Sequence, residues 1–95
     1  MICFDAPLWL WSGEGGNWHF ITVPEAQSAE IRVETLGTRR GFGSVRVDAT
    51  IGDVTWRTSV FPQKAGTFLL PVKADVRRRA AIAAGDEVSV TLQLI

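Results

Sequence analysis

The segment T-R-R-G-F-G-S, which ends at Ser44, combines residue types that bind anions. Arg39 and Arg40 carry planar guanidinium groups, each of which can hold a carboxylate or phosphate through two parallel hydrogen bonds. Gly41 and Gly43 have no Cβ, so the backbone there can come close to a ligand. The segment lacks the spacing of a P-loop or a dinucleotide-binding motif. Its alternative interpretation is the start of a strand, with glycines that relieve the backbone and arginines in solvent.

Three more cationic residues extend this candidate site: Arg57, Lys64 and Lys73. Together with the arginine and glycine segment they predict a groove that binds an anionic small molecule or an acidic segment of a partner, without catalysing a reaction. Arg57 has a second interpretation, because Arg46 and Asp48 lie on the facing strand of a predicted hairpin and can share a face with it. A cross-strand charge network is the simpler account of these three side chains.

The residues that could catalyse a reaction have no visible partners. His19 lies between Trp18 and Phe20 in an aromatic strand, where a histidine usually packs or faces solvent. Ser59 lies in a strand rather than on the sharp strand-to-helix turn that exposes a hydrolase nucleophile. We therefore expect no enzyme, no cofactor and no metal site. A small enzyme that acts through His19 or Asp53 is the least favoured alternative.

The charges of the chain oppose general binding to nucleic acid. Ten Lys and Arg residues are balanced by ten Asp and Glu residues, so no overall positive field attracts a polyanion. Arg77, Arg78 and Arg79 are consecutive, and at about 100° per residue they spread over roughly 200° of a helix instead of facing one groove. We interpret them as a solvated helix face near the acidic Asp75.

Cys3 is the single cysteine, so no disulfide can form within the chain, and we expect a cytoplasmic location. The first residues, M-I-C-F-D-A-P-L-W-L-W, have no basic region and fall far short of the roughly 20 apolar residues of a membrane helix. We expect no membrane association, and a monomer or a weak homodimer formed through an open sheet edge.

Hydrophobic periodicity predicts strands over residues 2–11, 18–23, 45–51, 54–61 and 67–72, and a last strand that ends at Leu94. Gly52 and Asp53 form a two-residue hairpin turn in this scheme. Two strands alternate strictly between apolar and polar residues, with these apolar positions facing the core: Val45, Val47, Ala49, Ile51, Val88, Val90, Leu92 and Leu94.

Two short helices are expected between the strands. Pro24 fits the first turn of one helix, and Gly37 fits its end. The second covers residues 74–84, which are good helix formers. The apolar positions of the first helix at near-helical spacing are Ala26, Ala29, Val33 and Leu36.

Two similar halves, residues 18–51 and 66–95, make up most of the chain. The stretch F-I-T-V-P-E from Phe20 returns as F-L-L-P-V-K from Phe68, and each is followed by a helix, a glycine and a strand. A half that cannot close its own apolar face is normally completed by its twin. The sequence therefore predicts a single mainly β domain over residues 1–95, a small pseudo-twofold barrel of six to seven strands with two short helices.

The four tryptophans are expected to supply core area, because each buries roughly 150–250 Å² in so small a domain. Trp9 and Trp11 share one face of a regular strand, so they can also close a barrel end or mark a binding groove.

Six motifs occur along the chain in this order: P-L-W, W-x-F, R-G-F-G-S-V, W-R-T-S-V-F-P, L-P-V-K-A-D-V-R and G-D-E-V. In this combination they resemble DUF1905, a mostly bacterial family of domains of unknown function. The resemblance implies a double-split β-barrel, the architecture of the swapped-hairpin transcription and antitoxin proteins, with both half-barrels in one chain. It supplies no established catalytic residues. A DNA-binding regulator, by analogy with those proteins, is the alternative to a ligand-binding module.

Overall fold

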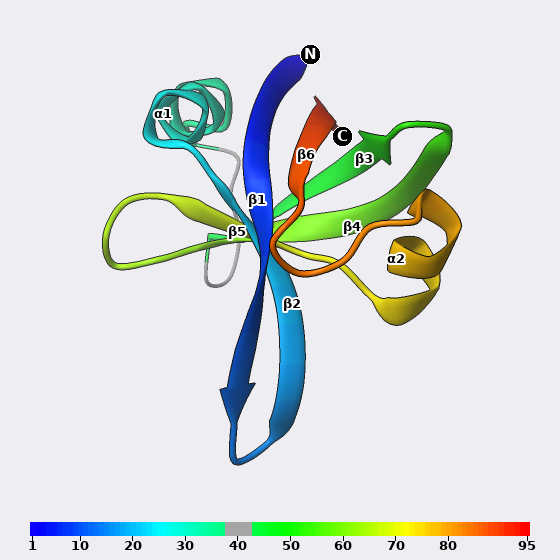
Figure 1. Cartoon of the computed structure of the whole chain (residues 1–95). Helices are drawn as coiled ribbons and strands as arrows, with labels where there is room; N and C mark the ends of the chain where they lie inside the picture. Colours follow the sequence, from blue (N-terminus) through cyan, green and yellow to red (C-terminus); the bar gives the residue numbers. More distant parts are fainter. Residues whose placement is uncertain (38–42) are drawn as a thin grey trace.

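The computed structural model describes residues 1–37 and 43–95, which form a closed β-barrel with two helices outside it (Figure 1). Its elements are β1 (Ile2–Gly13), β2 (Gly16–Val23), α1 (Glu25–Glu34), β3 (Val45–Ile51), β4 (Val54–Pro62), β5 (Phe68–Pro71), α2 (Ala74–Ala80) and β6 (Glu87–Leu94). The mainly β barrel of six strands with two short helices confirms the predicted fold class.

The barrel closes because two strands each belong to two sheets. The strand order is β1-β2-β5-β4-β3-β6, and all neighbours are antiparallel. In β1, Ile2–Pro7 pair with β6, whereas Leu8–Gly13 pair with β2. In β4, Val54–Val60 pair with β3, and Phe61 and Pro62 pair with β5. Each of these strands therefore passes from one sheet into the other.

The strand order is unchanged when β1 is exchanged with β4, β2 with β5 and β3 with β6. The helices follow the same rule, since α1 comes after β2 and contacts β1, whereas α2 comes after β5 and contacts β4. The topology is thus that of two equivalent half-barrels, and the common origin of their sequences stays a prediction.

The residues that correspond between the halves are not the predicted ones. The sequence matches Phe20 with Phe68, but Phe20 is half-buried on the outer face, whereas Phe68 lies in the core. Ile21 pairs directly with Leu70 where β2 meets β5, and both side chains are fully buried. Because successive side chains point to opposite faces of a strand, a match of Ile21 with Leu70 keeps inward positions together. The shared phenylalanine therefore does not mark equivalent positions in the two halves.

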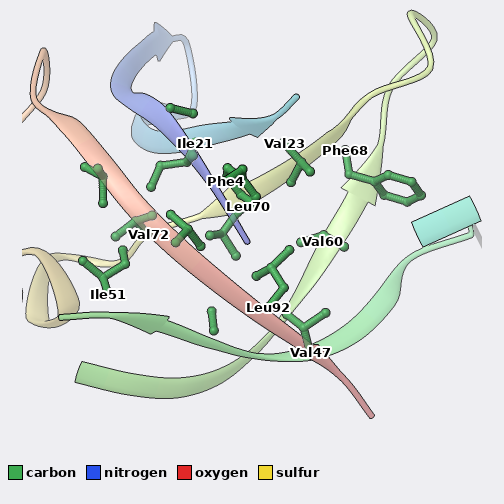
Figure 2. Packing of buried hydrophobic residues seen from close by; sticks show 14 of the residues in the cluster. Phe4, Ile21, Val23, Val47, Ile51, Val60, Phe68, Leu70, Val72 and Leu92 are labelled. Carbon is green, nitrogen blue, oxygen red and sulfur yellow. The ribbon is translucent and has the colours of Figure 1, made fainter. Parts of the chain in front are cut away.

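Branched apolar side chains from all six strands fill the barrel (Figure 2). The alternation predicted for β3 is confirmed, because its four apolar residues are all buried. The alternation predicted for β6 is confirmed for its first three apolar positions, whereas Leu94 is half-buried near the end of the strand. Fully buried members of the core include Leu8, Ile21, Val47, Val60, Leu70 and Leu92.

The inward face of α1 differs from the predicted one. Ser28 and Ile31 are buried, whereas the predicted Val33 is 67% exposed and Leu36 is 71% exposed. Hydrophobic periodicity cannot recognise an inward face that contains a serine, so the pattern selected the opposite side of the helix.

The hydroxyl of Ser28 explains why a polar residue occupies that face. It donates to the Val23 carbonyl at 2.9 Å and accepts from the Phe68 N–H at 3.0 Å. One side chain of α1 therefore holds the end of β2 and the start of β5 together inside the molecule.

α2 ends before the predicted residue 84, because Ala81 adopts left-handed backbone angles, with φ 56° and ψ 46°. The N–H of Ala81 bonds to the Arg78 carbonyl at 3.3 Å, and the N–H of Ile82 bonds to the Arg77 carbonyl at 3.0 Å. These bonds form a Schellman cap, whose left-handed position is usually a glycine. An alanine there conceals the end of the helix from sequence inspection.

The Gly52–Asp53 turn confirms the predicted hairpin between β3 and β4. Ile51 pairs with Val54, so the connection has two residues, and Gly52 has a φ of 58°. A positive φ suits the twisted turns of such hairpins. The resulting register places Asp48 opposite Arg57.

The β1–β2 hairpin extends beyond the barrel as a two-stranded arm (Figure 1). Leu10–Ser12 pair with Asn17–His19, but β5 pairs with β2 only from Phe20 onward. Along the arm, the second edge of β2 therefore has no strand partner among the described residues. A hydrogen bond of 2.9 Å from the Val72 N–H to the His19 carbonyl ties the base of this edge to the chain after β5.

Candidate functional site

A cleft of about 610 Å³ lies where the open edge of β2 faces β4 and the start of α2. We call it the cationic cleft. Its cations are Arg46 on β3, Arg57 on β4, Lys73 before α2 and Arg77 within α2. The described residues that line the cleft include no aspartate or glutamate. The rest of the lining comprises Asn17, Trp18, His19, Thr58, Ser59, Phe61, Pro71, Val72 and Ala74.

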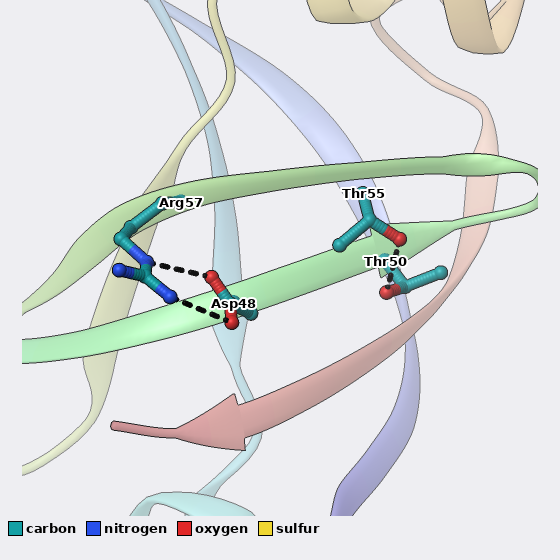
Figure 3. Close-up of polar contacts among 4 residues, drawn as sticks. All are labelled: Asp48, Thr50, Thr55 and Arg57. Carbon is teal, nitrogen blue, oxygen red and sulfur yellow. Dashed lines mark hydrogen bonds and ion pairs between the residues drawn. The ribbon is translucent and has the colours of Figure 1, made fainter.

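Arg57 is held in position by a two-point ion pair with Asp48 (Figure 3). Its Nε donates to Asp48 Oδ1 at 3.0 Å and its Nη2 donates to Oδ2 at 3.3 Å. The hydrogen bond lowers the pKa of Asp48 and raises that of Arg57, so both groups are charged at neutral pH. The pair confirms the Asp48–Arg57 part of the predicted cross-strand charge network, and it uses two of the three guanidinium nitrogens of Arg57. Arg46, the third predicted member, forms no ion pair within the described residues.

The junction of β5 and α2 supplies the cations on the other side of the cleft. Arg77 is half-buried, and its Nη1 donates to the Val72 carbonyl at 2.6 Å. Lys73 precedes the helix and is exposed. Within the described residues Arg46, Lys73 and Arg77 form no ion pair. The cleft therefore holds three positive charges that have no carboxylate at ion-pair distance within the described part of the chain.

His19 is the lining residue whose charge can change near neutral pH. Burial lowers its pKa below the usual 6.5, and the positive charge of Arg77 lowers that pKa further. The imidazole is therefore neutral at pH 7, when it can either donate or accept a hydrogen bond.

A second cleft, of about 580 Å³, lies on the outer face of the sheet formed by β1, β2, β5 and the end of β4. We call it the aromatic cleft. The centroids of the Trp9 and Phe20 rings are 5.4 Å apart, and Trp18 stacks nearly parallel to Phe20 at 6.3 Å. Trp11 is 44% exposed, Trp18 53% and Phe61 46%. Its described lining comprises Trp9, Trp11, Trp18, Phe20, Phe61, Gln63, Leu69 and Pro71.

The two clefts adjoin each other, because Trp18, Phe61 and Pro71 line both of them. Trp18 lies on the open edge of β2, where no further strand separates one cleft from the other. A single molecule can therefore contact positive charge at one end and aromatic rings at the other.

The tryptophans do not fill the core as expected. Trp11 and Trp18 are exposed, and Trp9 is half-buried with its Nε1 donating to Thr22 Oγ1 at 2.9 Å. Trp56 alone packs against the core, from its edge. The reason is alternation along the strands, because Leu8 and Ile21 point into the barrel, and Trp9, Trp11 and Trp18 therefore lie on the outer face. Trp9 and Trp11 do share one face, as predicted.

Two of the predicted site residues, Arg57 and Lys73, line the cationic cleft. Lys64 lies outside the described lining of both clefts, in the turn between β4 and β5. That turn is on the α1 side of the barrel, since Arg32 Nη1 of α1 donates to the Gly66 carbonyl.

Gly43 and Ser44 lie directly before β3 and are not among the described residues that line either cleft. Gly43 has a φ of 83°, which agrees with the alternative interpretation of a glycine at the start of a strand. Arg39, Arg40 and Gly41 lie outside the described residues.

The lining residues that sequence inspection did not assign to the site include Trp18, His19, Arg46 and Arg77. Arg46 and Arg77 were interpreted as solvated or cross-strand charges. One sequence signal could have identified Arg77. It lies one turn into α2, which follows β5 almost directly, and side chains of a helix tilt toward its N-terminus, so the Arg77 side chain returns to the end of β5. Arg78 and Arg79 do belong to an exposed face of α2, where Arg79 Nη1 lies 4.0 Å from Asp75 Oδ2.

Within residues 1–37 and 43–95, no three His, Cys, Asp or Glu side chains gather in a group that could hold a metal ion. In the same part of the chain, neither helix has the length and apolar character required to cross a membrane.

Comparison with known proteins gives a family but no activity. No protein of curated function matches the chain. The model of a domain of unknown function, DUF1905, matches residues 4–92, which is nearly the whole sequence. The chain therefore belongs to the DUF1905 family.

Proposed function

We propose that the protein is a non-enzymatic binding module whose cationic cleft holds an anionic small molecule. The observation that supports this proposal best is the convergence of four cations on a cleft with no acidic residue in its described lining. Positive charge that is gathered in a concave site raises the local concentration of anions. The volume of about 610 Å³ also lies within the range of roughly 300–1,000 Å³ that is usual for small-molecule sites.

The geometry of Arg57 supports binding at a defined place rather than diffuse attraction. Asp48 fixes the plane of the guanidinium group, so less side-chain freedom is lost when a ligand binds beside it. Arg77 is fixed in the same way by the Val72 carbonyl. Two oriented guanidinium groups suit a carboxylate or a phosphate, which prefer planar pairs of donors.

The proposal is non-enzymatic because the described lining offers no acid and base pair. His19 is neutral at pH 7, and the lining holds no carboxylate that could orient it or share its proton. The single Cys3 supports a reducing compartment such as the cytoplasm as the place of binding.

Titration calorimetry with pyrophosphate as the probe tests the proposal. We expect saturable binding that weakens as salt is raised, together with an increase in the melting temperature. The double variant Arg46→Gln and Lys73→Gln should weaken binding by about tenfold or more, because about 1.4 kcal/mol corresponds to a tenfold change in affinity.

The matched control is Lys64→Gln, which removes one exposed positive charge outside both clefts. It should leave pyrophosphate binding nearly unchanged. Equal weakening by the control and the cleft variants would show that net charge, and not the cleft, attracts the anion. Absence of saturable binding up to about 10 mM probe, well above millimolar dissociation constants, would overturn the proposal.

A further inference from the structure

The outer face of the β1–β2–β5–β4 sheet is left uncovered although it is largely aromatic. Trp11, Trp18 and Phe61 are each close to half exposed, and no residue of α1 or α2 belongs to the described lining of the aromatic cleft. A concentrated apolar surface of this kind on a small domain usually marks a binding site.

This face is a cleft with aligned rings rather than a flat patch. The ring planes of Trp18 and Phe20 are inclined by only 8°, so they present parallel aromatic surfaces along β2. Planar rings stack on such surfaces in an offset arrangement. Gln63 adds an amide to the lining, which can recognise a polar edge of a ring.

The positive charge of the adjoining cationic cleft distinguishes two candidate occupants of the aromatic cleft, a second copy of this chain and a small anionic ligand. In a symmetric dimer the same surface of each copy would meet, and the described lining of both clefts offers no aspartate or glutamate to pair with Arg46, Lys73 and Arg77. Self-association through this face would therefore leave these cations without a complementary partner. A small ligand that carries a negative group beside an aromatic ring can pair with the cations of one cleft and stack on the exposed rings of the other.

We infer that the two clefts form one composite site for a free nucleotide, with phosphates in the cationic cleft and a base stacked against Trp18 in the aromatic cleft. The inference rests on the proposed anion binding and names the ligand class of that site. The shared lining residues Trp18, Phe61 and Pro71 provide the continuity that one ligand needs.

Calorimetric titrations with three probes, ADP, pyrophosphate and adenosine, test this inference. ADP should bind about tenfold or more tightly than pyrophosphate, and adenosine should bind more weakly than ADP by a similar factor. ADP should also quench tryptophan emission more strongly than pyrophosphate, because only the base stacks on the exposed indoles. Trp56 packs against the core and provides an emission that binding leaves unchanged.

Two variants separate the aromatic contribution from the charge contribution. Trp18→Ala should weaken ADP binding by about five- to a hundredfold, the range expected for loss of one base-stacking aromatic, and weaken pyrophosphate binding by a smaller factor, because Trp18 lines the cationic cleft as well. Trp11→Ala, which alters the aromatic cleft alone, should also weaken ADP and spare pyrophosphate. Leu10→Ala is the control, because Leu10 is 46% exposed on the same strand as Trp11, lies on the opposite face of that strand, and is not among the described lining of either cleft.

The outcomes distinguish the inference from the proposed function. If ADP binds no more tightly than pyrophosphate, or if Trp18→Ala and Trp11→Ala leave ADP binding unchanged, the composite site is refuted while anion binding stands. If neither probe binds, both fail. Tight binding of a single-stranded oligonucleotide without binding of ADP would also overturn the inference, since the site would then require a strand.

Discussion

Replacement of Ser28 by alanine should destabilise the barrel far more than removal of a single hydroxyl suggests. The Ser28 side chain is fully buried and makes two hydrogen bonds, to the Val23 carbonyl and from the Phe68 N–H. Each net hydrogen bond contributes about 1 kcal/mol, and a buried group that loses its partner costs about 1–3 kcal/mol. Ser28→Ala should therefore lower the free energy of unfolding by about 2–4 kcal/mol.

Urea unfolding followed by tryptophan emission measures this loss. For a domain with an m-value of about 1–2 kcal/mol/M, the midpoint should fall by about 1–4 M. Ser89→Ala is the matched control, because Ser89 Oγ donates to Asp5 Oδ1 at 2.6 Å on the exposed surface. A surface substitution of that kind should change stability by at most about 0.5 kcal/mol. Equal midpoints for the two variants would refute the reasoning that Ser28 joins α1, β2 and β5.

Three further predictions follow from the backbone and from the pKa shifts. Ala81→Gly should raise the free energy of unfolding by about 0.5–1 kcal/mol, measured by thermal or urea denaturation. Glycine removes the steric cost of about 1–2 kcal/mol that alanine has in the left-handed conformation, but it also increases the conformational entropy of the unfolded chain, which cancels part of this gain. An unchanged or lower stability would contradict the cap geometry. The pKa of Asp48 is lowered mainly by its hydrogen bond with Arg57, so its contribution to stability is complete above the usual 3.8 and is lost as pH falls through the lowered value. Asp48→Asn should flatten the dependence of unfolding free energy on pH below about 4, and an unaltered slope would contradict the pairing. The pKa of His19 is lowered first by burial and second by Arg77, so stability should rise with pH up to about 6.5 as the unfolded chain releases its proton. An NMR titration of the imidazole should give a midpoint below 6.5 that Arg77→Gln raises only in part, and a midpoint at or above 6.5 would contradict it.

Most of the fold could be predicted because local rules and tertiary packing agree in the strands. Strict alternation placed the side chains of β3 correctly, since one face of that strand packs in the barrel and the other meets solvent. The Gly52–Asp53 pair predicted a turn that the backbone confirms. The errors occurred where a residue type is unusual for its position, at Ser28 inside the core and at Ala81 in a left-handed cap.

The candidate site was harder to predict because it is assembled from distant segments. Lys73 and Arg57 could be named as cations at strand and loop ends, but their approach to His19 depends on how far β2 runs past β5. Trp18 lies on the face of β2 opposite to the buried Ile21, so alternation along the strand, and not aromatic size, decides that it points away from the core. A rule that sends large aromatic residues to the core fails where they occupy the outward positions of a strand.

The first and last strands lie side by side, with Ile2 opposite Leu92, and both ends of the chain reach the same region of the barrel (Figure 1). A short linker could therefore join Ile95 to Met1, and the chain could be cut open between Gly52 and Asp53 instead. The rearranged polypeptide would begin with β4 and end with β3, yet it would travel around the barrel along the same route. Each half could also be produced as a separate peptide and mixed with the other, which makes the molecule a natural candidate for a split reporter.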